Sequence, residues 1–209
     1  MRIALSQRVE KITGYSEVRD CLDQRWHDLL AKHNHYGLAV PNRIEGTTEW
    51  CNNLDIEGII LTGGNDISGQ PRAKNVSIER DVTERALLDY AARNSLPVLA
   101  ICRGLQFLNL ELGGELVSVN GHVAVDHEVN CRGNPFVQIG SALVNSYHNY
   151  AISRDGLAAG LTPWAESEDG FIEAVSHRQH PWVGIMWHPE RSGSVLDVPI
   201  FNSLFAAGD

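Results

Sequence analysis

The chain has 209 residues and a formal net charge of −9 at pH 7, with 26 Asp and Glu against 17 Lys and Arg. This acidic balance argues against general binding of nucleic acid or of anionic membranes, and no apolar run is long enough to span a bilayer. The four cysteines are irregularly spaced without a Cys-x-x-Cys pair, and the N-terminus turns polar after Leu5. We therefore expect a reduced, cytoplasmic protein without a signal peptide. The length suits one sizeable domain, and we expect residues 1–209 to form it.

Apolar segments of strand length alternate with helical patterns through the first half of the chain. The expected strands are 2–6, 36–40, 58–61 and 98–101, and the expected helices are 17–32, 49–53, 78–93 and 105–112. Since short buried strands that alternate with helices form parallel sheets, we predict an α/β fold with a mainly parallel central sheet flanked by helices. Active sites in such sheets lie outside the carboxyl ends of the strands.

Two of these helices are predicted from the spacing of particular side chains. In 17–32, apolar residues recur at helical spacing and indicate one buried face, made of Val18, Cys21, Leu22, Trp26, Leu29 and Leu30. In 78–93, Arg80 and Glu84 are spaced as an i, i+4 pair on a charged face that we expect to be solvated. The apolar stripe expected opposite that face includes Val82, Ala86 and Tyr90.

The stretch 97–114 has the pattern of a nucleophile elbow. Four apolar residues, 98–101, lead into Cys102, and Arg103-Gly104 then open an apolar helical run. A cysteine between a buried strand and a helix N-terminus is held rigidly, and the helix end favours thiolate over thiol. Gly104 leaves the sharp turn uncrowded. The pattern therefore predicts that Cys102 is a nucleophile, although a buried free cysteine that only ends a core strand has the same local sequence.

The third expected strand, 58–61, ends in Thr62-Gly63-Gly64-Asn65-Asp66. Two glycines at this position let backbone N–H groups point into open space, which suits an oxyanion. An ordinary turn has the same residues, so the interpretation depends on the position of the pair at a strand end, as for Cys102.

After Gly114 the pattern changes to short β-like pieces over 115–146, a hairpin of 161–168 and 171–176 around Asp169-Gly170, a strand at 183–187 and a helix over 197–207. We therefore expect a β-rich C-terminal part. The polar cluster 145–150 is open to interpretation as a solvated turn. A zinc site from His122, His127 and Cys131 is conceivable, but the spacing fits no standard structural pattern, so we expect no metal.

The tripeptide His188-Pro189-Glu190 follows the last predicted strand. A thiol nucleophile needs a base, and an imidazole needs a partner that fixes its tautomer. Glu190 could lie on the same side of an extended segment as His188, and Pro189 stiffens the pair. Together with Cys102 these residues predict a Cys–His–Glu triad.

With these residues, the chain resembles the class I glutamine amidotransferase-like family. The segments that carry the resemblance are 61–66, 80–84, 97–114, 144–149, 169–174 and 184–190, in the expected order. Cys102-Arg103-Gly104-Leu105-Gln106 together with His188-Pro189-Glu190 is a specific combination. Arg80-Asp81-x-x-Glu84 and 145–148 most resemble the γ-glutamyl hydrolase branch, whose members cleave γ-glutamyl amides such as γ-glutamyl-γ-aminobutyrate.

The resemblance implies a role for each matching residue. Cys102 would attack the γ-carbonyl and form a γ-glutamyl thioester, with His188 as the acid–base group and Glu190 as its partner. Backbone N–H groups of Gly63 or Gly64 and of Arg103 would hold the oxyanion. The glutamyl α-amino and α-carboxylate groups would be held by Gln106 and by the backbone of Ser146, Tyr147 and His148. Water would then release glutamate, and we expect no cofactor.

The leaving group is a separate question. The polar loops after the first and third strands carry four cations in an acidic chain: Arg8, Lys11, Arg72 and Lys74. Cations at strand ends near Cys102 suit an anionic leaving group such as a phosphate or a nucleotide, and scattered surface charge is the alternative interpretation. The partner expected is thus a small-molecule γ-glutamyl substrate.

Two other functions remain open on the sequence. A glutaminase subunit would hydrolyse glutamine and deliver ammonia to a separate synthetase, and no synthetase-like segment accompanies these motifs. A binding or thiol-sensing protein could keep the fold without the chemistry, but the complete Cys, His and Glu set argues against it.

Overall fold

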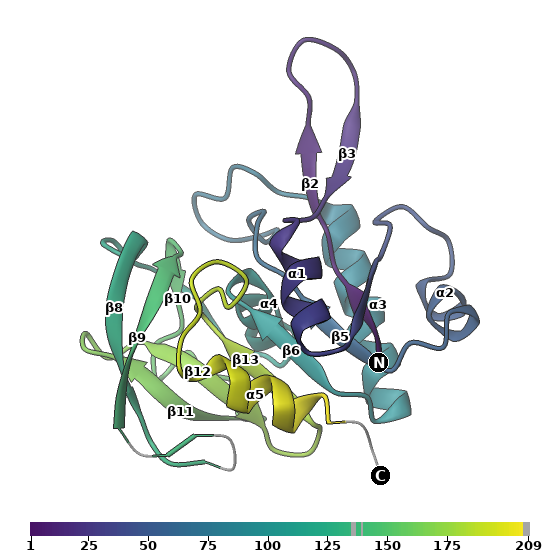
Figure 1. Cartoon of the computed structure of the whole chain (residues 1–209). Coiled ribbons are helices and arrows are strands. Elements are labelled where there is room, and N and C mark those ends of the chain that lie inside the picture. The colour runs from purple at the N-terminus through teal and green to yellow at the C-terminus, as the bar shows by residue number, and fades with distance from the viewer. Residues whose placement is uncertain (135–136, 139, 207–209) are drawn as a thin grey trace.

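A nine-stranded sheet in the order β4-β1-β5-β6-β13-β12-β11-β8-β9 forms the centre of the protein. The computed structural model describes residues 1–134, 137–138 and 140–206. Five adjacent strands run parallel, and the other four continue the sheet in antiparallel register (Figure 1). The parallel strands are β4 (Tyr36–Ala39), β1 (Arg2–Leu5), β5 (Gly58–Leu61), β6 (Val98–Ile101) and β13 (Trp182–Ile185). The antiparallel strands are β12 (Ile172–His177), β11 (Leu161–Ser167), β8 (Val123–Cys131) and β9 (Gly140–Tyr147).

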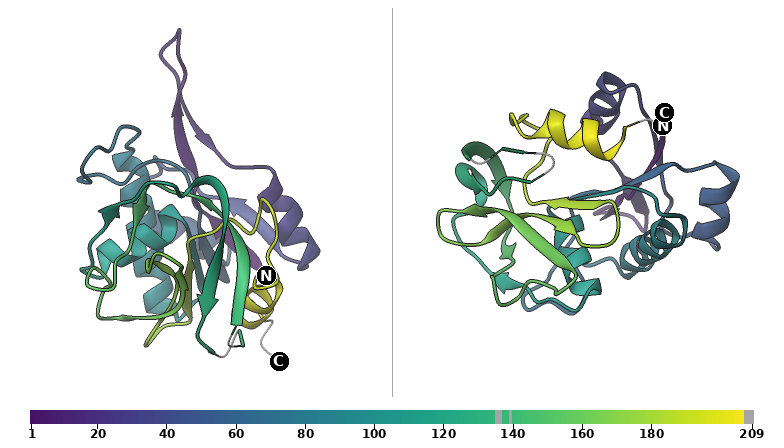
Figure 2. Two further views of the ribbon diagram at one scale, coloured as in Figure 1. Left: turned by 90° about the vertical axis from the view of Figure 1, so that its left-hand side faces the viewer. Right: turned by 90° about the horizontal axis from the view of Figure 1, so that it is seen from below.

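Helices cover both faces of the parallel half (Figure 2). Apolar side chains of α1 (Arg25–Lys32) and α5 (Asp197–Leu204) join the cluster on one face. The opposite face is covered by α2 (Thr47–Asn53), α3 (Ile78–Asn94) and α4 (Arg103–Glu111). The predicted α/β fold with a mainly parallel sheet and a β-rich C-terminal part is therefore confirmed.

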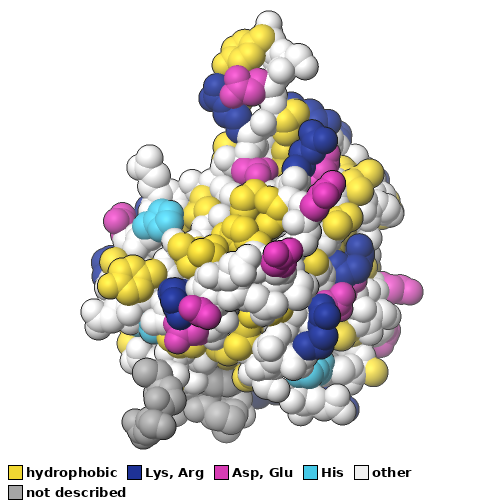
Figure 3. All heavy atoms as spheres, turned by 90° about the vertical axis from the view of Figure 1, so that its right-hand side faces the viewer, with side chains coloured by type: hydrophobic (Ala, Val, Ile, Leu, Met, Phe, Trp, Pro, Cys, Tyr) yellow, Lys and Arg dark blue, Asp and Glu magenta, His cyan; other side chains and the backbone are white. Residues whose placement is uncertain are grey.

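The N-terminal segment differs from the predicted helix over 17–32. Residues 18–21 form β3 (Val18–Cys21), which pairs with β2 (Arg8–Lys11) in a hairpin, and the helix begins only at Arg25. The helical spacing of Val18 and Cys21 was misleading, because Val18 is 56% exposed and only Trp26 and Leu30 of α1 are buried. This hairpin stands clear of the body of the molecule (Figure 3). Tyr15, which lies between its two strands in the sequence, is exposed.

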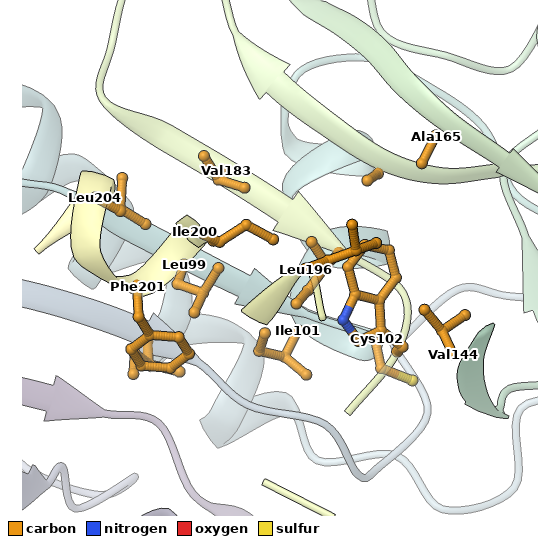
Figure 4. Close-up of a cluster of buried hydrophobic side chains, with 14 of the residues drawn as sticks. Leu99, Ile101, Cys102, Val144, Ala165, Val183, Leu196, Ile200, Phe201 and Leu204 are labelled. Carbon is orange, nitrogen blue, oxygen red and sulfur yellow. The ribbon is translucent and has the colours of Figure 1, made fainter. Parts of the chain in front are cut away.

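The alternation of side chains along the buried strands explains how one sheet fills two cores. Leu99 and Ile101 of β6 face the cluster that contains α5, whereas Val98 and Ala100 face α3 and α4. Figure 4 shows the first of these clusters, in which Leu99 and Ile101 pack near Ile200 of α5 and the row of labelled side chains reaches Cys102. The hydrophobic core therefore extends up to the candidate nucleophile.

The face of α3 that we expected to be solvated is the buried one. The side chains of Arg80 and Glu84 are both 0% exposed, whereas Val82 of the predicted apolar stripe is 57% exposed. Tyr90 is buried as expected. The helix packs its charged face inward because this face has partners of opposite charge and polar loop atoms, described below, so burial does not leave the charges unpaired.

The C-terminal part contains longer strands than the short pieces expected over 115–146. β8 has nine residues and β9 eight, whereas β7 (Val117–Ser118) has two. β7 pairs with another two-residue strand, β10 (Tyr150–Ala151), which follows β9. The predicted hairpin around Asp169-Gly170 is β11–β12. The predicted C-terminal helix ends at Leu204, and residue 207 of that prediction lies outside the described residues. Across the described ranges, the structure contains no helix of sufficient length and hydrophobicity to cross a bilayer.

Candidate active site

The carboxyl ends of β5, β6 and β13 meet at one edge of the sheet, and the candidate catalytic residues follow these ends. Cys102 comes directly after β6, with φ 49° and ψ −103°, a backbone conformation that a non-glycine residue rarely adopts. Its N–H is bonded to Ile185 O of β13 at 2.8 Å, and its carbonyl accepts from Gln106 N at 3.0 Å as α4 begins. The close approach to β5 requires glycine at 104, because a Cβ there would lie 2.3 Å from Leu61 O. Strand, turn and helix thus hold the sulfur in one place.

The Cys102 thiol lies among groups that favour its ionised form. Burial alone would raise its pKa, but the positive charge and hydrogen bond of His188, with smaller contributions from His148 and the Arg103 N–H, lower the pKa below its ordinary value. Burial alone would lower the pKa of His188, but the Cys102 thiolate and the Glu190 carboxylate raise it to about 9. The two shifts are coupled and favour a thiolate–imidazolium pair.

His188 is oriented from both its ring and its backbone. The ring Nδ1 donates to Glu190 Oε1 at 2.7 Å, which leaves Nε2 for Cys102. The segment is a turn and not the extended segment that we expected, because Arg191 N donates to His188 O at 3.1 Å. The Asn145 side chain accepts from His188 N and donates to His188 O, both at 2.9 Å. The polar cluster 145–150 is therefore not a solvated turn: Asn145 is 3% exposed and clamps the histidine.

The loop with Gly63 and Gly64 packs directly against His188. A Cβ on Gly63 would lie 2.5 Å from His188 Cε1, and Gly64 has φ 108°, so both positions require glycine. The loop is fixed from behind, where Arg80 Nη2 donates to Thr62 O at 2.6 Å and the Ser6 hydroxyl accepts from Thr62 N at 2.9 Å. The loop thus lies beside the thiol–imidazole pair, where oxyanion donors are needed.

A buried network of charges connects this loop to the elbow. Arg80 pairs with Glu84 at 2.9 Å, and the Arg103 guanidinium pairs with both Glu84 and Asp81. All four side chains are at most 5% exposed. Arg103 therefore contributes to the site through its N–H, and its side chain points away to anchor the start of α4 onto α3.

Three of the four predicted substrate-binding residues line a pocket that opens in front of Cys102 and His188: Gln106, Tyr147 and His148. Gln106 Nε2 donates to Tyr150 O at 2.9 Å. Ser146 does not line the pocket, since it is 1% exposed and its hydroxyl donates to His122 O. The His148 N–H is also taken, because it donates to His122 O at 2.9 Å.

The predicted cations are divided between the pocket and the hairpin. Arg8 lines the Cys102 pocket, and Arg72 and Lys74 line an adjoining pocket that shares Asp66, Asn149 and Tyr150 with it. Lys11 lies farther along the projecting hairpin and lines none of the described pockets. The loop with Arg72 is held close by hydrogen bonds from the Tyr150 hydroxyl to Pro71 O and from Lys74 N to Asp66 Oδ2.

Two pocket residues, Arg191 and Asn65, were not predicted from the sequence. Arg191 lines the Cys102 pocket, with its guanidinium 4.0 Å from the centre of the Tyr147 ring. Asn65 lines the same pocket, and its side chain bonds both Val9 N and Val9 O, which ties the glycine loop to the hairpin base. The sequence pointed to them only through their neighbours, because Arg191 follows Glu190 and Asn65 follows Gly64.

Behind the pocket, three side chains form a buried group that could hold a metal ion. One nitrogen of His122, one of His148 and one carboxylate oxygen of Glu173 all lie within 4.8 Å of one another. Of the residues considered for zinc from the sequence, His122 belongs to this group and His127 lies beside it, whereas Cys131 lies in the hydrophobic core.

Comparison with known proteins gives consistent matches. The family model described as peptidase C26 matches residues 4–190. The chain is 30% identical over 208 residues to a protein of Campylobacter jejuni named gamma-glutamyl-CDP-amidate hydrolase. The match covers 99% of this chain and 98% of that protein. It is also 34% identical over 156 residues to anthranilate synthase component 2 of Azospirillum brasilense, with 73% and 74% covered. A glutamine amidotransferase structure from Thermotoga maritima shares the fold, with a TM-score of 0.66, 18% identity, and coverage of 90% of this chain and 76% of that one.

Proposed function

The chain belongs to the peptidase C26 family within the class I glutamine amidotransferase-like proteins, and we propose that it is a cysteine-dependent hydrolase of γ-glutamyl amides. The observation that carries the proposal is the alignment of Cys102, His188 and Glu190 at the ends of β6 and β13, with the Gly63-Gly64 loop against the imidazole. This arrangement has a nucleophile, an acid–base group with a fixed tautomer and a backbone loop for the oxyanion.

In the proposed first step, the Cys102 thiolate attacks the γ-carbonyl carbon and a C–S bond forms. Charge moves to the carbonyl oxygen, which the N–H groups of Arg103 and of Gly63 or Gly64 stabilise. As the tetrahedral intermediate collapses, the C–N bond breaks and His188 Nε2 gives its proton to the leaving nitrogen. Glu190 keeps Nδ1 protonated, so that Nε2 is the nitrogen that exchanges protons.

In the second step, His188 removes a proton from water as the water oxygen attacks the thioester. The C–S bond then breaks, glutamate leaves, and the thiolate–imidazolium pair is restored. Gln106, Tyr147 and His148 line the pocket and would hold the glutamyl α-amino and α-carboxylate groups, while Ser146 supports them from behind.

We assign an anionic group, a phosphate or a nucleotide, to the leaving side of the substrate. Arg72 and Lys74 line the pocket that adjoins Cys102 across Asn149 and Tyr150, which is where a leaving group larger than ammonia would extend. The name of the Campylobacter relative supports this assignment, since it specifies a γ-glutamyl amidate of the nucleotide CDP and that protein matches this chain from end to end.

The proposal treats residues 1–209 as one domain, which the continuous nine-stranded sheet supports. It also needs a reduced Cys102, which a reducing compartment such as the cytoplasm maintains. All four cysteines are free thiols in the described part of the chain, which supports this placement.

The test is glutamate release from a panel of glutamine, neutral γ-glutamyl amines, γ-glutamyl amino acids and phosphate- or nucleotide-bearing γ-glutamyl amides. We expect fast release from an anionic member and slow release from glutamine, with none in Cys102→Ala. Equal turnover of neutral and phosphorylated amides would overturn the leaving-group assignment. Release that persists in Cys102→Ala would overturn the mechanism.

A glutaminase subunit of an amidotransferase is the second candidate, because the chain is also similar to anthranilate synthase component 2. In that case glutamine alone would be hydrolysed, and the rate would rise when a separate synthetase is added. The same panel separates the two candidates, since only the hydrolase discriminates among γ-glutamyl conjugates.

A further inference from the structure

Four side chains from separate elements converge behind the Cys102 pocket. His122 precedes β8, His127 lies on it, His148 follows β9 and Glu173 lies on β12. His122, His148 and Glu173 are 5%, 3% and 1% exposed. Glu173 Oε1 lies 3.6 Å from His148 Nε2 and 4.0 Å from His122 Nδ1, whereas His127 Nε2 lies 3.6 Å from the other oxygen, Oε2. None of these three nitrogens has a hydrogen-bond partner among the described residues, and neither does Glu173 Oε1.

The other ring nitrogens show which atoms carry lone pairs. His122 Nε2 is 2.9 Å from Asp169 Oδ2, and His148 Nδ1 is 3.0 Å from Tyr150 O. Both oxygens can only accept, so each of these nitrogens carries the hydrogen. In the neutral form of each ring, His122 Nδ1 and His148 Nε2 would carry the lone pairs that face Glu173 Oε1. A lone pair repels a buried carboxylate, so a cation between these atoms, either a proton or a metal ion, stabilises the cluster.

We propose that His122, His148 and Glu173 bind a divalent zinc ion. Two imidazoles and one carboxylate form a ligand set that zinc accepts. Ligands bonded at about 2.0 Å to a tetrahedral ion lie about 3.3 Å apart, and the ligand atoms of these three residues lie within 4.8 Å of one another, so side-chain shifts bring them to that geometry. His127, which faces the other oxygen of Glu173, lies outside this group. Asp169 and Tyr150 O would be the outer partners that orient two of the ligand rings, as is usual at zinc sites.

The site would be structural, because its three ligands are at most 5% exposed, which leaves the fourth position of the ion to a water and not to substrate. It would join the loop before β8 to β12 and to the segment 148–150, which lines the Cys102 pocket. Zinc would therefore fix that wall of the pocket without taking part in the hydrolysis.

The first measurement is the metal content of the full chain, with any purification tag removed, after expression in zinc-supplemented medium. Cys102→Ala is the background, since a thiolate beside His188 could bind zinc by itself. We expect about one zinc per chain in this background. The control adds His27→Gln, which changes an exposed histidine on α1, and this double variant should bind the same amount. Adding His122→Gln should remove the metal, and Asp169→Asn should lower the affinity about 10- to 100-fold.

The second measurement does not depend on the folding of a ligand variant. The Cys102→Ala protein is stripped with a chelator and titrated with Zn²⁺ or Co²⁺. We expect the melting temperature to fall on stripping and rise on zinc addition, and bound Co²⁺ to show the intense visible absorption of a tetrahedral site. A stripped protein that binds neither ion, with an unchanged melting temperature, would overturn the proposal and leave a proton as the cation of the cluster. Neither readout uses γ-glutamyl hydrolysis, so its failure and that of the proposed function are distinguishable.

Discussion

At the scale of single residues, the proposed triad predicts a graded loss of activity. Cys102→Ala or Cys102→Ser should lower kcat/KM by at least about 10⁴-fold, because Cys102 is the cysteine that lines the pocket in front of His188. His188→Asn should lower kcat/KM nearly as much. Glu190→Gln should lower kcat/KM less, roughly 10²- to 10⁴-fold, since Glu190 only orients and stabilises the imidazole. Steady-state rates and mass spectrometry of a trapped γ-glutamyl adduct check the series, and substantial activity in Cys102→Ser would contradict it.

The pH dependence is set by the thiolate–imidazolium pair. Activity should fall on the acid side as the thiolate becomes protonated, at a pH below the ordinary thiol pKa. It should fall on the alkaline side near pH 9, where His188 loses the proton that it gives to the leaving nitrogen. Glu190 contributes to the raised pKa of His188, so Glu190→Gln should move the alkaline limb of the kcat/KM profile to lower pH.

The control for this profile is Glu45→Gln, which removes the same charge from an exposed position. Both limbs should stay in place in this variant. A Glu190→Gln profile that is lower but not displaced would show that Glu190 acts only as a structural support.

The triad residues could be predicted from the sequence because each follows a buried strand, and the carboxyl ends of adjacent parallel strands meet. Asn145 and Arg191 could not be assigned in the same way. Asn145 reaches His188 only because β9 and the turn after β13 are close in space, a contact between residues 43 positions apart. The spacing of residues within one helix or strand does not indicate which distant residues come into contact, as Asn145 and His188 do.

At the scale of elements, α3 allows a direct comparison of a buried and an exposed arginine. Arg80 is 0% exposed and bonds Glu84 and Thr62 O, whereas Arg85 is 52% exposed and pairs with Glu111 at the surface. Arg80→Ala leaves the buried carboxylates of Glu84 and Asp81 with the single guanidinium of Arg103, so it should destabilise the fold by about 3–5 kcal/mol. Arg85→Ala should cost about 0–1 kcal/mol.

Denaturant unfolding of both variants measures this difference. The two changes remove the same side chain from the same helix five positions apart, so helix propensity cancels between them. Equal destabilisation would mean that the buried network contributes nothing beyond a surface ion pair.

The same helix shows why part of the fold could not be predicted. The sequence pattern located α3 correctly but placed Arg80 and Glu84 on the exposed side, because charged residues are normally exposed and the partners Asp81 and Arg103 are not recognisable as partners before the fold is known. The hairpin β2–β3 was missed because two of its residues, Val18 and Cys21, match by chance the helical spacing that continues into α1. The buried strands were predictable because a short, continuous apolar run bounded by turn residues is typical of a strand that is buried on both faces.

At the scale of the whole molecule, the net charge and the charges near the pocket act differently on a bound substrate. The chain has a net charge of −9, and the face in Figure 3 shows acidic and basic side chains interspersed. Charges farther apart than a Debye length, about 10 Å at 0.1 M salt, are screened. An anionic substrate in the pocket is therefore affected mainly by nearby groups, among them Arg8, Arg191, Arg72 and Lys74.

This distribution predicts a salt effect that depends on the substrate. KM for a phosphate-bearing γ-glutamyl amide should rise roughly three- to tenfold between low and high salt, because screening weakens attraction by the pocket cations. KM for a neutral γ-glutamyl amide should stay nearly constant. Lys74→Gln should raise KM for the anionic substrate at low salt and flatten its salt dependence, whereas Lys11→Gln, the same change on the projecting hairpin, should do neither. If salt instead lowers KM for the anionic substrate, repulsion by the net charge outweighs the pocket, and Arg72 and Lys74 do not receive the leaving group.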